Sequence, residues 1–137
     1  MTTSFSVEGG DFTGAGLASS QIKKILKQLN VDPTIIKRVV VALYEAEVNI
    51  VAHAYRGEIS VEIEPDCIQM VLKDEGPGIP DIEQAMRRGY STASTKVREM
   101  GFGAGMGLPN ISDNADAFTI ESEVGKGTTL FIKILIV

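Results

Sequence analysis

The chain has 137 residues, of which 44% are hydrophobic and 23% charged, a size and composition typical of one compact domain rather than two. Its 13 Lys and Arg against 18 Asp and Glu give a net charge of −5, so there is no diffuse cationic surface to bind nucleic acid. A single cysteine and a single histidine exclude an internal disulfide and the usual Cys/His zinc clusters.

Neither end of the sequence carries a targeting or membrane signal. Residues 1–10 lack a basic segment followed by an apolar stretch. The apolar run at 130–137 is broken by Lys133 and is far shorter than the roughly 20 residues that span a bilayer. We therefore expect a cytoplasmic protein with no membrane partner.

The first elements predicted in chain order are an edge strand and two helices. Residues 4–7 alternate weakly, as a strand does, and a glycine-rich stretch separates them from an amphipathic helix over about 17–29. The second helix begins with Asp32 as N-cap and Pro33 at its first position. Its apolar stripe continues to about Ala54, after which Gly57 is predicted to end the helix.

Four further strands are predicted as two local hairpins. Residues 58–64 alternate apolar and polar side chains, and a turn at 65–66 leads into a strand over 68–72. The second hairpin joins 118–122 to 128–135 through two glycines. Strands that pair locally in this way favour a mostly antiparallel sheet.

The connection between the hairpins is long, polar and glycine-bearing, and covers about residues 76–101. It contains a predicted short helix over about 81–88 and is followed by a predicted helix over about 106–114. A connection of this length in a small domain is usually either a functional lid or disordered. The order of elements indicates helices packed on one face of the sheet, which is an α+β class.

Glu45 and Asn49 lie four positions apart on the second predicted helix, so their side chains project from the same face about one turn apart. The carboxylate could accept a proton or orient a nucleophile, and the amide oxygen suits a hard cation such as Mg²⁺. The plain alternative is a solvated helix face on which Glu and Asn occur by chance.

Asp74 follows a predicted strand and is itself followed by Gly76 and Gly78. A buried carboxylate can accept a hydrogen bond from the exocyclic amine of adenine, whereas guanine presents a carbonyl oxygen there. The pattern therefore favours ATP over GTP. An ordinary Asp-Gly-Pro-Gly turn is the alternative.

Glycines alternate at positions 101, 103, 105 and 107, ahead of the last predicted helix. Without Cβ atoms, backbone N–H groups can approach phosphate oxygens, and the helix N-terminus adds to the attraction. The sequence contains neither Gly-x-Gly-x-x-Gly nor a Walker P-loop. A phosphate site of another kind is predicted, with a hinge that binds no ligand as the alternative.

Taken together, these motifs resemble the N, G1, G2 and G3 boxes of the GHKL ATP-binding superfamily, which includes gyrase, histidine kinases and mismatch-repair ATPases. The matching segments, in chain order, are Glu45-x-x-x-Asn49, Asp74-x-Gly76-x-Gly78, Gly103-x-Gly105-x-Gly107-Leu108 and Gly127-Thr128. The resemblance covers nearly the whole chain. It is strongest to the small bacterial anti-sigma-factor serine kinases and the related switch kinases of stress-response partner-switching modules.

The resemblance implies the Bergerat fold, a two-layer α/β sandwich with a mixed, mostly antiparallel sheet, helices on one face and an ATP lid. It implies one domain over residues 1–137, with the lid at about 79–102, and ATP and Mg²⁺ as cofactors. Glu45 would be the catalytic base or polarising residue, Asn49 would hold magnesium, and Asp74 would contact adenine.

The remaining boxes are implied to complete the nucleotide pocket. Their residues are Gly76, Gly78, Gly103, Gly105, Gly107, Leu108, Gly127 and Thr128. The three G2 glycines would line the phosphates, and Thr128 would support the pocket through Asp74 or a water. Several family kinases carry a basic residue where this sequence has Gly103, a departure for which Lys96 or Arg98 of the lid could substitute.

The function implied by the resemblance is transfer of the γ-phosphoryl group of ATP to a serine of a STAS-domain anti-sigma antagonist. The alternative is a non-catalytic, ATP-responsive binding module that sequesters a sigma factor or activates a phosphatase. Neither function involves nucleic acid directly, and a homodimer is compatible with both.

Overall fold

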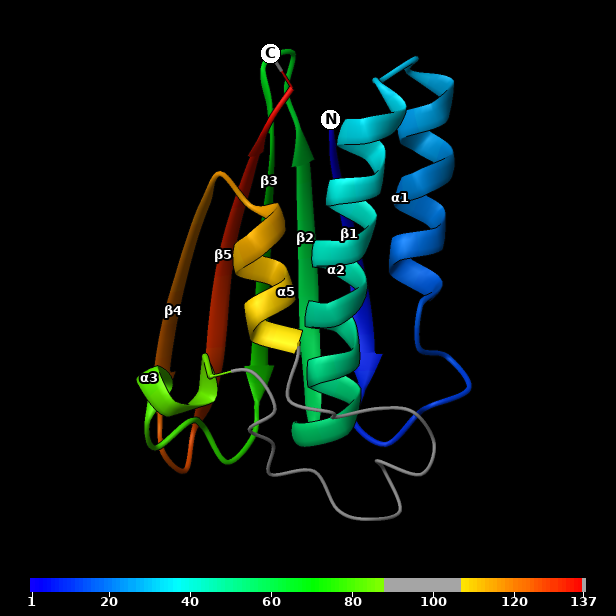
Figure 1. Cartoon of the computed structure of the whole chain (residues 1–137). Helices are drawn as coiled ribbons and strands as arrows, with labels where there is room; N and C mark the ends of the chain where they lie inside the picture. The colour runs from blue at the N-terminus through cyan, green and yellow to red at the C-terminus, as the bar shows by residue number, and fades with distance from the viewer. Residues whose placement is uncertain (88–106, 137) are drawn as a thin grey trace.

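The structure, a computed structural model, describes residues 1–87 and 107–136 (Figure 1). Its strands are β1 (Thr2–Glu8), β2 (Arg56–Ile63), β3 (Cys67–Glu75), β4 (Ala117–Glu123) and β5 (Gly127–Leu135). Its helices are α1 (Leu17–Gln28), α2 (Pro33–His53), the single-turn α3 (Ile82–Ala85) and α5 (Gly107–Asn114).

The strands form one sheet in the order β1-β2-β3-β5-β4. All neighbouring strands among the described residues pair antiparallel, so the sheet lacks the parallel pairing that the expected mixed sheet allowed. β2 with β3 and β4 with β5 form the two predicted hairpins, and β1 lies at the predicted edge. The two-layer α+β class is confirmed.

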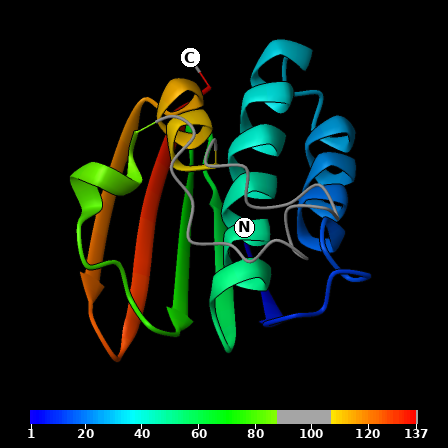
Figure 2. The same cartoon turned by 60° about the horizontal axis from the view of Figure 1, so that its bottom comes forward.

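The three longer helices cover one face of the sheet. Figures 1 and 2 show α2 between α1 and α5, with α2 and α5 in front of the sheet and α1 beside α2 near the β1 edge. α2 contacts β1, β2, β3 and β5 as well as both neighbouring helices. Because α2 is central to the helical layer, its position is fixed both by the sheet and by the two neighbouring helices.

The core lies between the two layers, because inward-facing apolar residues alternate with exposed ones along the strands. Fully buried side chains from the sheet include Ile59, Met70, Leu72 and Ile134, and those from the helices include Ile22, Leu26, Val39, Leu43, Ile50 and Ile111. Cys67, the single cysteine of the chain, is 3% exposed at the start of β3. No helix among residues 1–87 and 107–136 is long and apolar enough to cross a bilayer.

α2 begins as predicted, because the Asp32 carboxylate accepts a hydrogen bond from the Thr34 N–H at 2.8 Å and Pro33 occupies the first turn. The predicted end of the helix at about Ala54 is confirmed, but the assignment of Gly57 as the residue that ends it is wrong. The helix ends at His53 with Ala54 in an extended conformation, and Gly57 lies inside β2. A Cβ at Gly57 would lie 2.9 Å from a methyl carbon of Ile50, so glycine there lets β2 pass close beneath α2.

α1 has no cap of its own, since Gly16 precedes it and has no side chain. The cap comes instead from Glu47 of α2, a carboxylate that is only 2% exposed. Its two oxygens accept hydrogen bonds from the N–H groups of Ala18 at 3.1 Å and Ser19 at 3.4 Å. This contact fixes the start of α1 against the middle of α2.

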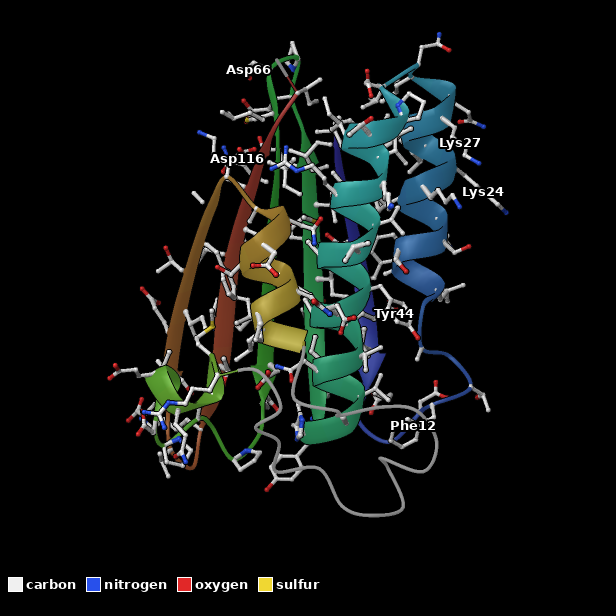
Figure 3. All side chains as sticks on the ribbon, in the orientation of Figure 1. Phe12, Lys24, Lys27, Tyr44, Asp66 and Asp116 are labelled. Carbon is white, nitrogen blue, oxygen red and sulfur yellow. The ribbon has the colours of Figure 1, made fainter. Side chains whose placement is uncertain are left out.

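Arg38 links α2 to the segment between α5 and β4. It donates to the Asn114 carbonyl at the end of α5 and lies 3.3 Å from the Asp116 carboxylate; Figure 3 labels Asp116. Hydrogen bonding from the Leu135 N–H, with a smaller effect from Arg38, lowers the pKa of Asp116.

The first helix predicted around the lid, over about 81–88, is shorter than expected: it is the single-turn α3, where the Asp81 carboxylate accepts a hydrogen bond from the Gln84 N–H at 3.0 Å. The second, predicted over about 106–114, is α5, and the described residues 107–114 agree with that prediction. Of the predicted lid at 79–102, residues 88–102 lie outside the described residues.

Candidate functional site

The segments that carry the predicted site residues lie in the lower half of the molecule as drawn in Figure 1, where β3 and α2 end and β5 begins. The end of β3 carries Asp74, and the start of β5 carries Thr128. The C-terminal half of α2 carries Glu45, and the first residue of α5 is Gly107. Four segments far apart in sequence therefore supply one region.

Asp74 is held by the last hairpin. Its Oδ1 accepts a hydrogen bond from the Thr128 N–H at 3.0 Å, and Thr128 is 6% exposed. Burial raises the pKa of Asp74, and the Thr128 N–H partly offsets this effect. The predicted support of Asp74 by Thr128 is thus present as a direct contact, made by the backbone rather than the hydroxyl.

Several positions near Asp74 are glycine because other backbone atoms lie where a Cβ would be. A Cβ at Gly127 would lie 2.0 Å from the Asp74 carbonyl oxygen, a distance that no side chain can occupy. A Cβ at Gly76 would lie 3.0 Å from the Cα of Ala54, just after α2. The second glycine after Asp74, Gly78, has a φ of +76° and packs against the Glu123 carbonyl at the end of β4.

Ser122 on β4 is a further residue of this end that the motifs did not reveal. Its hydroxyl accepts a hydrogen bond from the Ile79 N–H at 2.7 Å and lies 2.9 Å from the Thr128 hydroxyl. It therefore ties the start of the predicted lid to the β4–β5 hairpin. A sequence signal for Ser122 exists: the inward-facing residues of β4 and β5 are otherwise apolar, and Ser122 pairs with another polar residue, Thr128.

Glu45 faces the start of α5. Asn110 donates from its amide nitrogen to the Glu45 Oε1 at 3.3 Å, and a Cβ at Gly107 would lie 3.5 Å from Oε2. Asn110 was also missed by the sequence analysis, although it follows Gly107 by one helical turn on α5. The two helices thereby fix the Glu45 carboxylate without covering it completely, since the residue is half-buried.

Asn49 lies one turn beyond Glu45 on α2 and is half-buried. Within the part of the chain that the structure describes, its side-chain amide makes no hydrogen bond. Its oxygen is thus free of the described residues and suits a hard cation. One turn further, burial lowers the pKa of His53, which favours the neutral imidazole.

The other predicted glycine-box residues divide into two groups. Gly107 and Leu108 start α5, and Leu108 is 7% exposed and part of the core, so it anchors the first turn. Gly103 and Gly105 lie outside the described residues.

The arrangement can bind an adenine nucleotide on chemical grounds. Asp74 keeps one carboxylate oxygen that Thr128 does not engage, which can accept from an exocyclic amine. Glu45 and Asn49 supply the oxygen donors that Mg²⁺ prefers. The N-terminus of α5 supplies backbone N–H groups of the kind that bind phosphate.

Comparison with known families matches residues 14–134 to the histidine kinase-like ATPase domain. An anti-sigma F factor of Geobacillus kaustophilus is 34% identical over 110 residues, which cover 74% of this chain and 72% of that protein. The serine/threonine-protein kinase RsbT of Bacillus subtilis is 31% identical over 112 residues, which cover 79% of this chain and 78% of that protein.

A solved structure shares the fold. The structure of the RsbU and RsbW domains of Rv1364c from Mycobacterium tuberculosis matches with a TM-score of 0.65 at 15% identity. The match covers 98% of this chain and 32% of that longer chain. Together with the family match, this confirms the resemblance and the architecture inferred from the four boxes.

Proposed function

The chain belongs to the histidine kinase-like ATPase domain family, and from this premise we propose that it is an ATP-dependent serine kinase of a bacterial partner-switching module. Its substrate in this proposal is a serine of a STAS-domain anti-sigma antagonist, and its location is the cytoplasm. The observations that support the proposal are the packing of Glu45 against the start of α5 and the close approach of Gly76, two residues after Asp74, to Ala54 at the end of α2.

Asp74 selects the base in this proposal. The Thr128 N–H holds its Oδ1, so its second oxygen has a fixed direction in which to accept the adenine amine. Asp74 is half-buried, and the positions packed closely around it, Gly76 and Gly127, carry no side chain, which favours access of adenine to the carboxylate. A guanine carbonyl at the same place would face a carboxylate and be rejected.

Glu45 and Asn49 act on the reacting end of the nucleotide. Bound ATP supplies the transferred phosphoryl group, and Mg²⁺ neutralises phosphate charge. Asn49 offers its amide oxygen as a metal ligand. Glu45, held on one oxygen by Asn110, accepts the proton of the attacking serine hydroxyl on the other oxygen. The first turn of α5, together with Gly103 and Gly105, binds the phosphates.

A second candidate is a binding module that sequesters a sigma factor with negligible turnover. The specific observation in its favour is that one of the relatives named above is an anti-sigma F factor. Gly103, at a position that is basic in several family kinases, also fits slow transfer. Either candidate is compatible with a homodimer, which sedimentation of the purified chain would detect.

Labelled ATP separates the two candidates and tests the role of Glu45. The purified chain is incubated with γ-labelled ATP, Mg²⁺ and a STAS-domain protein from the same genome, and the phosphorylated residue is mapped. We expect Glu45→Ala to slow transfer by at least about a hundredfold, the usual contribution of a general base, with ATP affinity nearly unchanged.

Glu62→Ala, which removes an exposed carboxylate from β2, is the matched control and should transfer at the parent rate. Full-rate transfer by Glu45→Ala would contradict the assigned role. If the parent transfers nothing but captures a sigma factor only with ATP present, the second candidate replaces the first.

A further inference from the structure

A groove lies between α1 and the first half of α2, away from the nucleotide end. It encloses about 610 Å³, a volume that can admit several apolar side chains. Its floor consists of Val31, Ile36, Val40 and Val41. We name it the α1–α2 groove.

The rim of the α1–α2 groove is basic. Lys23 and Lys27 border it from α1, where they are one helical turn apart, and Lys37 borders it from α2. All three side chains are exposed, and none forms an ion pair with a carboxylate of residues 1–87 or 107–136. The lysines thus border an apolar surface with their charges available to a partner.

The basic rim stands out against the rest of the molecule. Residues 17–44 contain five basic side chains and one acidic side chain, a net charge of +4 in a chain whose net charge is −5. The single acid, Asp32, is engaged in capping α2. Three of the five basic side chains, Lys23, Lys27 and Lys37, line the groove beside its partly buried apolar floor, and this favours an acidic occupant.

We propose that the α1–α2 groove binds an acidic amphipathic helix of a partner protein. Two neighbouring antiparallel helices leave a groove into which a third helix can pack its apolar stripe. Leucine-like side chains of the partner would fill the valine-lined floor. Glutamates or aspartates on both flanks of its apolar stripe would meet Lys23 and Lys27 on one side and Lys37 on the other.

This site is additional to the proposed nucleotide and phosphoryl-transfer site. The groove residues occupy the first turns of α2, whereas Glu45 and Asn49 occupy its later turns. In Figure 3, Lys24 and Lys27 mark the end of α1 that lies farthest from Phe12 and the bottom of the molecule. A partner helix in the groove would leave the nucleotide end accessible.

Two other occupants fit the groove less well. A second copy of the chain placed groove to groove would bring identical lysines face to face, which is unfavourable. A flat anionic membrane would attract the lysines but would leave the concave floor unfilled. Both are outcomes that the experiment can return.

The test is an NMR titration of the ¹⁵N-labelled full chain with a synthetic acidic helix. The probe is a peptide of about 18 residues with leucines at helical spacing and glutamates on both flanks. We expect saturable amide shifts confined to residues 23–41. A peptide of the same composition with its apolar stripe scrambled, and one with lysine in place of glutamate, should give no saturable shifts.

Charge reversal on α1 tests the rim. Lys23→Glu combined with Lys27→Glu should weaken peptide binding about tenfold, the combined effect of exposed ion pairs. Lys24→Glu is the matched control, because Lys24 lies between them in sequence but does not line the groove; its effect should stay below about threefold. Calorimetry with Mg-ATP should give the parent affinity for all of these variants.

Several results would overturn the inference while leaving the proposed kinase activity untouched. They are the absence of saturable shifts at about 1 mM peptide, shifts centred on the nucleotide end, and equal losses from Lys24→Glu and the double reversal. Binding to phosphatidylglycerol vesicles without peptide binding would assign the groove to a membrane. A dimer that the double reversal dissociates would assign it to a second copy.

Discussion

At the scale of single residues, Asp74 combines two effects that a substitution can separate. The Thr128 N–H needs a hydrogen-bond acceptor at position 74, and the proposed contact with the adenine amine needs a second acceptor oxygen that carries negative charge. Asn supplies the acceptor but presents an NH₂ group in place of one carboxylate oxygen. We expect Asp74→Asn to lower the affinity for Mg-ATP by at least about a hundredfold, measured by calorimetry.

The same variant should fold as stably as the parent at neutral pH, or more stably. Burial raises the pKa of Asp74 in the folded state, so ionised Asp74 disfavours folding once the pH exceeds its ordinary pKa. The stability gain of Asp74→Asn over the parent should therefore grow as the pH rises through the raised pKa and then stay constant. Asp66→Asn, an exposed site in the β2–β3 turn, is the control. Parent-like heats of ATP binding in Asp74→Asn would contradict the adenine contact.

Gly127 is a second position at which the neighbouring atoms decide which residue fits. A Cβ there would lie 2.0 Å from the Asp74 carbonyl oxygen, whereas a Cβ at Gly125 would meet nothing within 4 Å. We expect Gly127→Ala to lower the free energy of unfolding by about 3 kcal/mol, in the range of forced overpacking. Gly125→Ala, which only places an L-residue at a φ of +84°, should cost about 1 kcal/mol. Urea denaturation measures both, and equal losses would show that the close approach to Asp74 is relaxed at little cost.

At the scale of elements, the start of α1 depends on a side chain from another helix. Glu47 accepts two of the N–H groups that α1 cannot satisfy itself. We expect Glu47→Ala to reduce the free energy of unfolding by about 2–3 kcal/mol, since hydrogen bonds to a buried charged group are lost. Hydrogen exchange should rise most in the first turn of α1.

The matched control for Glu47→Ala is Glu45→Ala, two residues earlier on the same helix. Glu45 is half-buried and accepts one side-chain hydrogen bond, so its removal should cost much less stability while affecting phosphoryl transfer. Similar stability losses in the two variants would contradict the capping role of Glu47.

Elements defined by local patterns could be predicted from the sequence. The Asp32-Pro33 start of α2, both hairpins and the edge position of β1 follow from signals within a few residues. Gly57 was misassigned because glycine serves equally as a helix stop and as a place for close contact, and only packing against Ile50 distinguishes the two. The cap on α1 could not be predicted, because Glu47 lies 29 residues from Ala18 and no local rule connects them.

The site shows the same division. Spacing singles out Glu45, Asn49 and Asp74, and their roles stay predictions, while the structure places Glu45 against the start of α5 and Asp74 against the start of β5. Ser122 and Asn110 were missed because each acts through a contact between distant segments. The assignments of Gly103 and Gly105 stay predictions, since they lie outside the described residues.

At the scale of the whole molecule, α2 links two surfaces with different chemistry. Its first turns border the lysine-rimmed α1–α2 groove, and its later turns carry Glu45 and Asn49. Because α2 contacts most of the sheet and both adjacent helices, these two surfaces share one rigid support. A partner protein could therefore be held at one end while chemistry proceeds at the other.

The burial of Cys67 gives the chain its own reporter of global opening. As the sole thiol, and with 3% of its surface exposed, it should react with Ellman's reagent only when β3 separates from the core. If opening is fast relative to labelling, the rate follows the population of open molecules. Mg-ATP at about a hundred times its Kd should then slow the reaction about a hundredfold. An unchanged rate would mean that the nucleotide does not stabilise the fold. The rate of the thiol reaction therefore reports nucleotide binding without any engineered probe.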